Sequence, residues 1–249
     1  MIVKDTERVV IYRCEDGIAH LTLNRPRQIN AFNVQMRDEL FETLCLFQDD
    51  PNAKVGLLRG GGERGFCVGA DLTEFGTAPS QVVARSVRWE RDLWGLFREL
   101  RKPLIASLHG YVIGSGIEIA ALCDIRIASE DTLFSLPEVA LGMIPAAGGT
   151  QTIPRSIGGS RALRMILTNQ QIDAITALDM GLIHKIVTGE LLLAEAYRIA
   201  QDLLAKDEDV LALSKKSIKE GMDLPLNLAL SHERRLLSKL VSIRLFNRD

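Results

Sequence analysis

Gly114-Ser115-Gly116-Ile117-Glu118 is a glycine-rich turn that runs directly into an apolar segment, and a second carboxylate follows in Leu136-Pro137-Glu138-Val139. Glycines let a main chain approach a ligand closely, and amides at the start of a helix point hydrogen-bond donors toward negative charge. Such a segment can hold an oxyanion while Glu118 and Glu138 move protons. The pattern is typical of an enzyme that acts beside a carbonyl group.

Strand and helix patterns alternate outward from this segment. Apolar β-prone runs predict strands at 9–13, 18–23, 55–58, 104–108, 125–128 and 133–134, and helical spacing predicts helices at 36–47, 83–97, 117–122 and 161–167. From about residue 191 the pattern is purely helical, over 191–204, 210–218 and 224–240. The fold class is therefore α/β, with a core over residues 1–190 and a C-terminal helical region over 191–249.

Composition excludes several classes of protein. Thirty basic and thirty-two acidic residues leave a formal charge of −2, which gives no global attraction to nucleic acid or to an anionic membrane. No apolar run approaches the roughly 20 residues that span a bilayer, and the charged start of the chain does not resemble a signal peptide. We therefore expect a soluble cytoplasmic protein without a membrane partner. The four cysteines are widely scattered, which argues against a disulfide framework or a zinc site.

Residues 60–65 satisfy the pattern of a dinucleotide-binding turn, but no amphipathic helix follows them. A glycine-rich turn is the better interpretation. The more useful part of this region is Val68-Gly69-Ala70-Asp71-Leu72, in which small residues expose main-chain amides. The N–H of Ala70 is thus a candidate donor to an anionic oxygen.

Each glutamate also has a purely structural interpretation. Glu118 lies in an apolar run and can be a buried, hydrogen-bonded carboxylate, whereas Glu138 follows a proline and can be an exposed charge or a helix cap. Taken together they are more informative, because two carboxylates in different surroundings can have separated pKa values. One can then hold a proton while the other accepts one.

A series of motifs runs in order from about residue 10 to residue 187. They are Leu23-Asn24-Arg25-Pro26, Asn30-Ala31-Phe32-Asn33, Phe66-Cys67-Val68-Gly69-Ala70-Asp71-Leu72, His109-Gly110-Tyr111, Gly114-Ser115-Gly116-Ile117-Glu118, Cys123-Asp124, Pro137-Glu138, Leu141-Gly142 and Gly148-Gly149-Thr150-Gln151. The series closely resembles the enoyl-CoA hydratase/isomerase, or crotonase, superfamily, and enoyl-CoA hydratase most of all. The resemblance implies a core of repeated β-β-α turns, acyl-CoA thioester substrates, and homotrimers that commonly pair into hexamers.

The resemblance also implies residue roles. The backbone N–H groups of Ala70 and Ser115 would form the oxyanion hole, Glu118 would act as base toward water, and Glu138 would exchange the proton at the substrate α-carbon. No metal or redox cofactor is implied, because coenzyme A is part of the substrate. Substrate and CoA contacts are implied at Gln28, Ile29, Ala31, Val68, Ala70, Leu72 and Gly114.

The chain departs from the family pattern at three internal positions. Ser115 replaces the usual glycine, Thr73 stands where some relatives have a lysine, and Ala146 replaces a glycine after Pro145. The usual terminal segment that helps to cover the CoA site is also missing after Asp249, so closure of that site is an open point.

The leading hypothesis is syn addition of water to the 2,3 double bond of a trans-2-enoyl-CoA, which gives a 3-hydroxyacyl-CoA. An enoyl-CoA isomerase or another acyl-CoA enzyme of the superfamily is the first alternative. A non-catalytic CoA-binding member is the second. The sequence leaves the acyl chain length, branching and pathway open.

Overall fold

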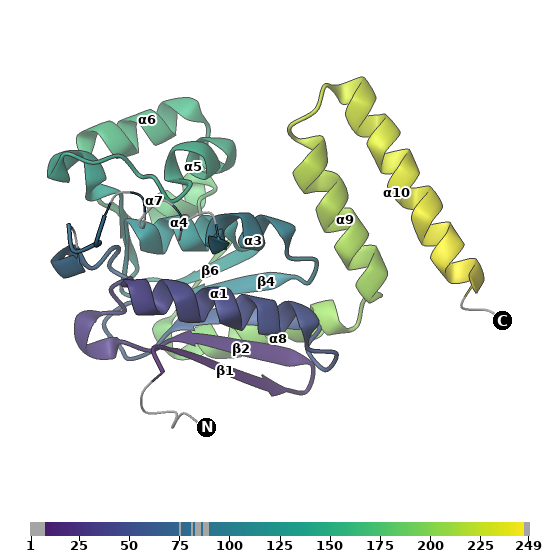
Figure 1. Cartoon of the computed structure of the whole chain (residues 1–249), viewed down its shortest axis with the longest axis horizontal. Coiled ribbons are helices and arrows are strands. Elements are labelled where there is room, and N and C mark those ends of the chain that lie inside the picture. Colours follow the sequence, from purple (N-terminus) through teal and green to yellow (C-terminus); the bar gives the residue numbers. More distant parts are fainter. Residues whose placement is uncertain (1–7, 75, 81, 83–85, 87–89, 247–249) are drawn as a thin grey trace.

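A computed structural model of the chain describes residues 8–246 apart from residues 75, 81, 83–85 and 87–89 (Figure 1). The strands are β1 (Val10–Glu15), β2 (Ile18–Leu23), β3 (Val55–Gly60), β4 (Leu104–Leu108), β5 (Tyr111–Ile113), β6 (Ile125–Ser129), β7 (Leu133–Ser135), β8 (Ile172–Asp173) and β9 (Lys185–Val187). The α-helices are α1 (Val34–Asp49), α3 (Leu93–Glu99), α4 (Ser115–Leu122), α5 (Gly149–Ile157), α6 (Gly159–Thr168), α7 (Ala174–Met180), α8 (Leu192–Leu204), α9 (Glu208–Gly221) and α10 (Leu226–Phe246). Short 3-10 helices are η2 (Pro26–Gln28), η3 (Leu72–Glu74), η4 (Pro137–Leu141) and η5 (Gly189–Leu191).

The predicted opening hairpin is present, and its turn has a clear local cause. Asp16 and Gly17 both have positive φ, at 50° and 84°, which is the geometry of a two-residue hairpin turn that favours glycine. The turn sets β1 antiparallel to β2, and α1 then carries the chain back so that β3 pairs with β2 in parallel. This is the first β-β-α unit of an α/β fold.

Within the described residues, the main sheet has the order β1-β2-β3-β4-β6-β9, and a smaller sheet has the order β5-β7-β8. The pairs from β2 through β9 in the main sheet are parallel, so the ends of β3 and β4 lie at the same edge. The α/β class predicted from the alternating pattern is therefore confirmed. Part of the helix predicted at 83–97, including Val83 and Val87, lies outside the described residues, and its end is α3.

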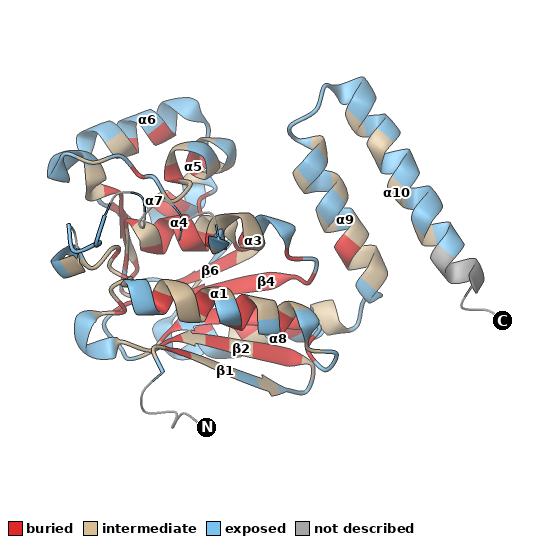
Figure 2. Cartoon of the chain, viewed as in Figure 1, coloured by how far each residue is buried: buried red, intermediate tan, exposed pale blue. Residues whose placement is uncertain are grey.

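Helices cover both faces of the main sheet. Met36, Leu40, Leu44 and Phe47 of α1 recur at helical spacing and are fully buried in the larger core, beside β1 and β2. On the opposite face α8 packs against β3, β4 and β6 (Figure 2). Helix α8 thus completes a layer of the core. The domain boundary predicted at residue 190 stays a prediction.

The α9–α10 hairpin stands beside this layered body, and most of α10 is exposed (Figures 1 and 2). Its attachment to the body includes a charged cluster. Lys215 Nζ lies 2.6 Å from Asp124 Oδ2, and Lys219 Nζ lies 3.2 Å from Asp124 Oδ1. Asp124 Oδ2 also accepts the N–H of Leu104 at the start of β4. None of the helices in the described part of the chain has the length and apolar character that crossing a membrane requires.

We predict that Asp124→Ala lowers the free energy of unfolding by about 2 to 3 kcal/mol, because it leaves a buried ammonium and a strand amide without their acceptor. The side chains of Lys215 and Asp124 are only 11% and 19% exposed. Asp223→Ala is the matched control, since its ion pair with Arg155 is more than half exposed and should be worth less than about 1 kcal/mol. Urea unfolding of the two variants measures the difference, and equal losses would contradict the prediction.

Candidate active site

Three segments that are far apart in sequence lie side by side at the carboxyl edge of the main sheet. The segment after β3 pairs with residues 29–32 on one side, through Val68 N–H to Ile29 O (3.2 Å) and Phe32 N–H to Gly69 O (2.8 Å). On its other side it pairs with β5, through Ile113 N–H to Cys67 O (2.9 Å). The parallel order of the strands thus brings the motif around Ala70 beside the motif around Ser115.

The amide of Ala70 is directed away from residues 29–32. Phe32 forms its backbone hydrogen bonds with Gly69 O and Asp71 N, on either side of Ala70, so the N–H of Ala70 itself points to the opposite side. Gly69 has φ +90°, and a methyl group at this position would lie 3.1 Å from Ile113 O. Glycine is therefore needed here for the close approach to β5.

Gly114 lies where this segment, α4 and Glu138 meet. Its φ is +52°, and it forms the N-cap of α4, so the N–H of Ser115 begins the helix without an intrahelical acceptor. A methyl group at Gly114 would lie 2.6 Å from Glu138 Oε1 and 3.5 Å from Gly69 Cα. The structure therefore brings the segments of Ala70 and Ser115 together with the carboxylate of Glu138.

Glu118 is buried in α4, with 2% of its surface exposed. Its Oε1 accepts the N–H groups of Ala147 and Gly149, each at 2.9 Å, from the segment that begins α5. Burial raises the pKa of Glu118 to about 7, and the nearby charge of Glu138 also raises it. The amides of Gly149 and Ala147 oppose this rise, because their hydrogen bonds favour the charged carboxylate and lower its pKa.

Glu138 is held differently. It lies in η4 directly after Pro137, it is half-buried rather than fully exposed, and burial raises its pKa. Its Oε2 is buried and has no hydrogen-bond partner within the described residues. One carboxylate is thus fixed by backbone donors, while the other keeps an oxygen available. Two carboxyls in such different settings can divide the roles of acid and base.

The residues implied in substrate and CoA contacts border the same region. Gln28 and Leu72 are exposed, and Ile29, Ala31 and Val68 are half-buried. The structure places all five on the two paired segments, 28–31 and 68–72, next to the candidate oxyanion donors.

Two polar residues that sequence reasoning left without a role brace these segments. Arg25 donates to Ala31 O (2.5 Å) and pairs with Asp71 Oδ2 (3.0 Å). The fully buried Asn30 accepts the N–H of Arg25 and donates to Gly61 O and Gly65 O. The only feature of the sequence that could have pointed to these two residues is their place in the motifs Leu23-Asn24-Arg25-Pro26 and Asn30-Ala31-Phe32-Asn33.

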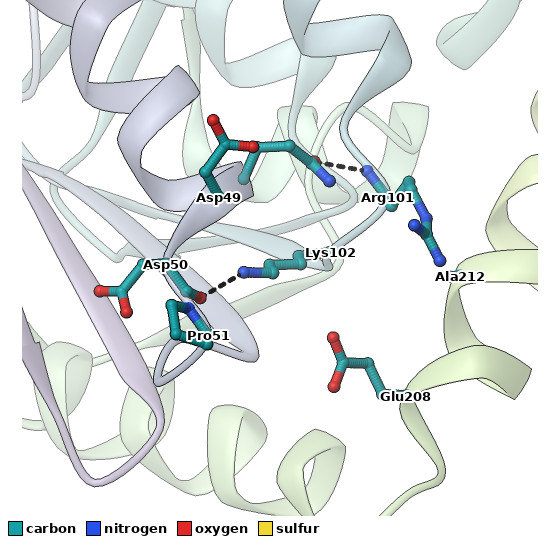
Figure 3. Close-up of a pocket in the computed structure, with 8 residues that line it drawn as sticks. Asp49, Asp50, Pro51, Arg101, Lys102, Glu208 and Ala212 are labelled. Carbon is teal, nitrogen blue, oxygen red and sulfur yellow. Dashed lines mark hydrogen bonds between the residues drawn. The ribbon is translucent and has the colours of Figure 1, made fainter. Parts of the chain in front are cut away.

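Other features lie outside this site. Residues 61–65 form an irregular turn after β3, in which Gly62 has a φ of +79° and its carbonyl is bonded to His109 Nε2 (2.9 Å). The positive φ explains the glycine at this position. No three His, Cys, Asp or Glu side chains of the described residues gather as a metal-binding group. A surface pocket lined by Asp49, Lys102, Glu208 and neighbouring residues shares no residue with the glutamate site (Figure 3). Lys102 lines that pocket, and its Nζ donates to Phe47 O and Asp50 O.

The family described as enoyl-CoA hydratase/isomerase matches residues 13–246 of this sequence. The chain belongs to that family. It is 34% identical to a crotonyl-CoA hydratase of Syntrophomonas wolfei, over 90% of this chain and 86% of the relative. It is 35% identical to a short-chain-enoyl-CoA hydratase of Clostridium acetobutylicum over the same shares.

The fold is similar to that of a solved enoyl-CoA hydratase of Bacillus anthracis, with a TM-score of 0.87, 31% identity, and 97% of this chain and 96% of that chain covered. The predicted family and crotonase-type fold are therefore confirmed. The prediction of an enzyme of the hydro-lyase type holds at the level of the family.

We predict that Glu118→Gln stabilises the protein at alkaline pH. The folded-state pKa of Glu118 is raised from 4.5 to about 7, so folding favours the protonated carboxyl. Its contribution to stability is full below pH 4.5 and is lost as the pH rises toward 7, at a cost of about 3 kcal/mol when the group is fully ionised.

The free energy of unfolding of Glu118→Gln should therefore exceed that of the parent at pH 8 and match it near pH 4.5. Glu99→Gln, which makes the same substitution at an exposed position on α3, is the control. Urea unfolding at the two pH values gives the answer, and a constant difference between Glu118→Gln and the parent would refute the assignment.

Proposed function

We propose that this protein is an enoyl-CoA hydratase that adds water to the 2,3 double bond of a trans-2-enoyl-CoA and yields a 3-hydroxyacyl-CoA. The observation that carries the proposal is the convergence of Glu138, Gly114 and the segment of Ala70 next to the anchored carboxylate of Glu118. Family membership supports the class of reaction.

In the proposed mechanism the thioester oxygen lies between the N–H groups of Ala70 and Ser115. Water attacks C3, and the electron pair of the double bond moves toward the carbonyl, so that oxygen gains charge as in an enolate. Two backbone donors directed at that oxygen lower the barrier, and losing one such donor typically costs about 3 to 4 kcal/mol. No metal or redox cofactor takes part in this proposal.

Glu118 removes a proton from the attacking water, and Glu138 delivers a proton to the α-carbon C2. The raised pKa of Glu138 favours the protonated form that this delivery needs. The pKa of Glu118, near 7, lies in the range where a general base is most effective at neutral pH. If both carboxyls face one side of the substrate, the hydroxyl at C3 and the proton at C2 are added from that same side.

For the CoA moiety we propose the surface formed by the paired segments 28–31 and 68–72, with Gln28, Ile29, Ala31, Val68, Ala70 and Leu72 in contact and Gly114 next to the thioester. Their support is their position beside the candidate oxyanion donors. Thr73 offers no ammonium to the CoA phosphates, so backbone atoms and shape would supply most of these contacts.

We predict that Glu118→Gln and Glu138→Gln each lower the kcat for crotonyl-CoA hydration by about 10²- to 10⁴-fold, the usual contribution of a general acid or base. Loss of the conjugated absorbance of crotonyl-CoA measures the rate, and circular dichroism checks that the variants fold. Glu99→Gln is the matched control and should keep the parent rate. A double Glu118→Gln/Glu138→Gln variant with the parent rate would overturn these roles.

The isomerase alternative rests on Glu138, whose buried Oε2 has no partner within the described residues and can carry a proton between two carbons. A 3-enoyl-CoA substrate with product analysis separates the two: an isomerase gives the 2-enoyl-CoA, and it depends much more on Glu138 than on Glu118. Binding of acyl-CoA without turnover of any enoyl chain length would identify a non-catalytic member.

We further propose a homotrimer, or a hexamer made of two trimers, as the family resemblance implies. Apolar side chains on the exposed surface are consistent with contacts between subunits: Leu163 and Leu167 lie one turn apart on α6, and Ile175 on α7 is 72% exposed. A cytoplasmic location stays a prediction.

The mass of the assembly in solution tests this proposal directly. Light scattering during gel filtration should give three or six times the chain mass of 27.5 kDa. Ile175→Glu, which places a charge in an exposed apolar position, should shift the population toward smaller species. A parent protein that elutes as a monomer at micromolar concentration would contradict the proposed assembly.

A further inference from the structure

The N–H of Ala70 lies on a segment that is neither a helix nor a regular strand. Phe32 and Ala70 form an isolated parallel bridge, and η3 begins two residues later at Leu72. The other candidate oxyanion donor, the N–H of Ser115, begins the helix α4 and takes its direction from that helix. The direction of the Ala70 donor must instead come from contacts between segments.

The peptide unit between Gly69 and Ala70 is held through its carbonyl. Gly69 O accepts the N–H of Phe32 at 2.8 Å, and since a trans peptide unit is planar, the N–H of Ala70 points the opposite way. A rotation of this unit would turn the Ala70 donor away from the site. A second bond, from Asp71 N–H to Phe32 O at 2.9 Å, closes the bridge. So short a pairing depends on support from side chains.

The guanidinium of Arg25 joins the two segments beside this bridge. It donates to Ala31 O at 2.5 Å, next to Phe32, and to Asp71 Oδ2 at 3.0 Å, next to Ala70. The side chains of Arg25 and Asp71 are only 16% and 13% exposed, so solvent screens their charges less than at the open surface. One planar cation therefore holds the neighbour of each bridge residue.

Both carboxylate oxygens of Asp71 are engaged. While Oδ2 accepts from Arg25, Oδ1 accepts the Thr73 hydroxyl at 2.6 Å and the Thr73 N–H at 3.2 Å. The Thr73 hydroxyl, and to a smaller extent Arg25, hold the pKa of Asp71 below its usual value. The partner of Arg25 is thus an ionised carboxylate with a fixed orientation.

We propose that Arg25 and Asp71 are positioning residues, whose ion pair directs the N–H of Ala70 at the thioester oxygen. This inference rests on the proposed function. Arg25 also holds Ala31 O, so the same pair ties the proposed CoA-contacting segment 28–31 to the oxyanion donor. Arginine suits this role because its planar group donates to two acceptors in a fixed geometry, whereas the ammonium of lysine is a single point charge.

An oxyanion donor acts most strongly in the transition state, in which the thioester oxygen gains charge. A misdirected donor should therefore lower kcat and leave KM nearly unchanged. We expect Asp71→Asn and Arg25→Lys each to lower the kcat for crotonyl-CoA hydration by about 10-fold, which is less than the loss of about 10²- to 10³-fold when a donor is removed outright. The double variant should lose little more than either single one, because both changes break the same contact.

Asp202→Asn and Arg198→Lys are the matched controls. They make the same substitutions in an ion pair on α8 whose side chains are more than half exposed. Both controls should keep the parent kcat, and circular dichroism checks that all variants fold.

The carbonyl stretch of a bound thioester reports on the oxyanion donors without any turnover. Butyryl-CoA has the chain length of crotonyl-CoA but no double bond to hydrate, and an isotopic label at its carbonyl carbon isolates the band in an infrared difference spectrum. Binding to the parent should lower the frequency of this band. Asp71→Asn and Arg25→Lys should reduce the shift by up to about half, because Ala70 supplies one of the two donors.

The possible failures have different signatures. A parent that shifts the carbonyl band but hydrates no enoyl-CoA, with a smaller shift in the two variants, would refute the proposed function and leave the inference in place. An active hydratase whose variants keep the parent kcat and the full shift would overturn the inference. A loss of kcat with an unchanged band would also overturn it, since the ion pair would then act elsewhere in the structure. A parent that shows no shift would refute the oxyanion role of Ala70, and the inference with it.

Discussion

The carboxylate of Glu118 is buried, and the rest of the site depends on how its charge is accommodated. A carboxylate that is 2% exposed is costly unless donors replace the water it has lost, and here the N–H groups of Ala147 and Gly149 do so at 2.9 Å. This requirement fixes the start of α5 against α4. It also explains why Gly149 cannot carry a side chain, since a methyl group there would lie 2.7 Å from Glu118 Oε1.

Close packing of the backbone also shapes the rest of the site. Gly69 and Gly114 both have positive φ, and a Cβ added at either would crowd its neighbours, so the main chain itself lines the site. Backbone amides become the natural donors in such a site, as those of Ala147 and Gly149 are for Glu118. Glu138 completes the group with a carboxyl that is less buried and less firmly held.

Much of the fold was predictable because its pattern is local. The hairpin turn at Asp16 and Gly17, the apolar face of α1 and the runs of β3, β4 and β6 were all expected from residue type and spacing. The short strands β5, β8 and β9 were not expected, because two or three residues carry no periodicity and become strands only by pairing with distant partners. The packing of α8 on the main sheet also escaped prediction, since a helical pattern does not reveal which surface it covers.

For the site, the sequence by itself determined which chemical groups are present: two glutamates and small residues that expose amides. The order of its motifs identifies the family. Only the tertiary structure decided which groups meet. The bonds of Glu118 to the start of α5, the contacts of Arg25 with Asp71 and of Asn30 with Gly65, and the attachment of α9 through Asp124 all join residues more than twenty positions apart. Such contacts depend on strand order and helix packing, and local sequence encodes neither of these directly.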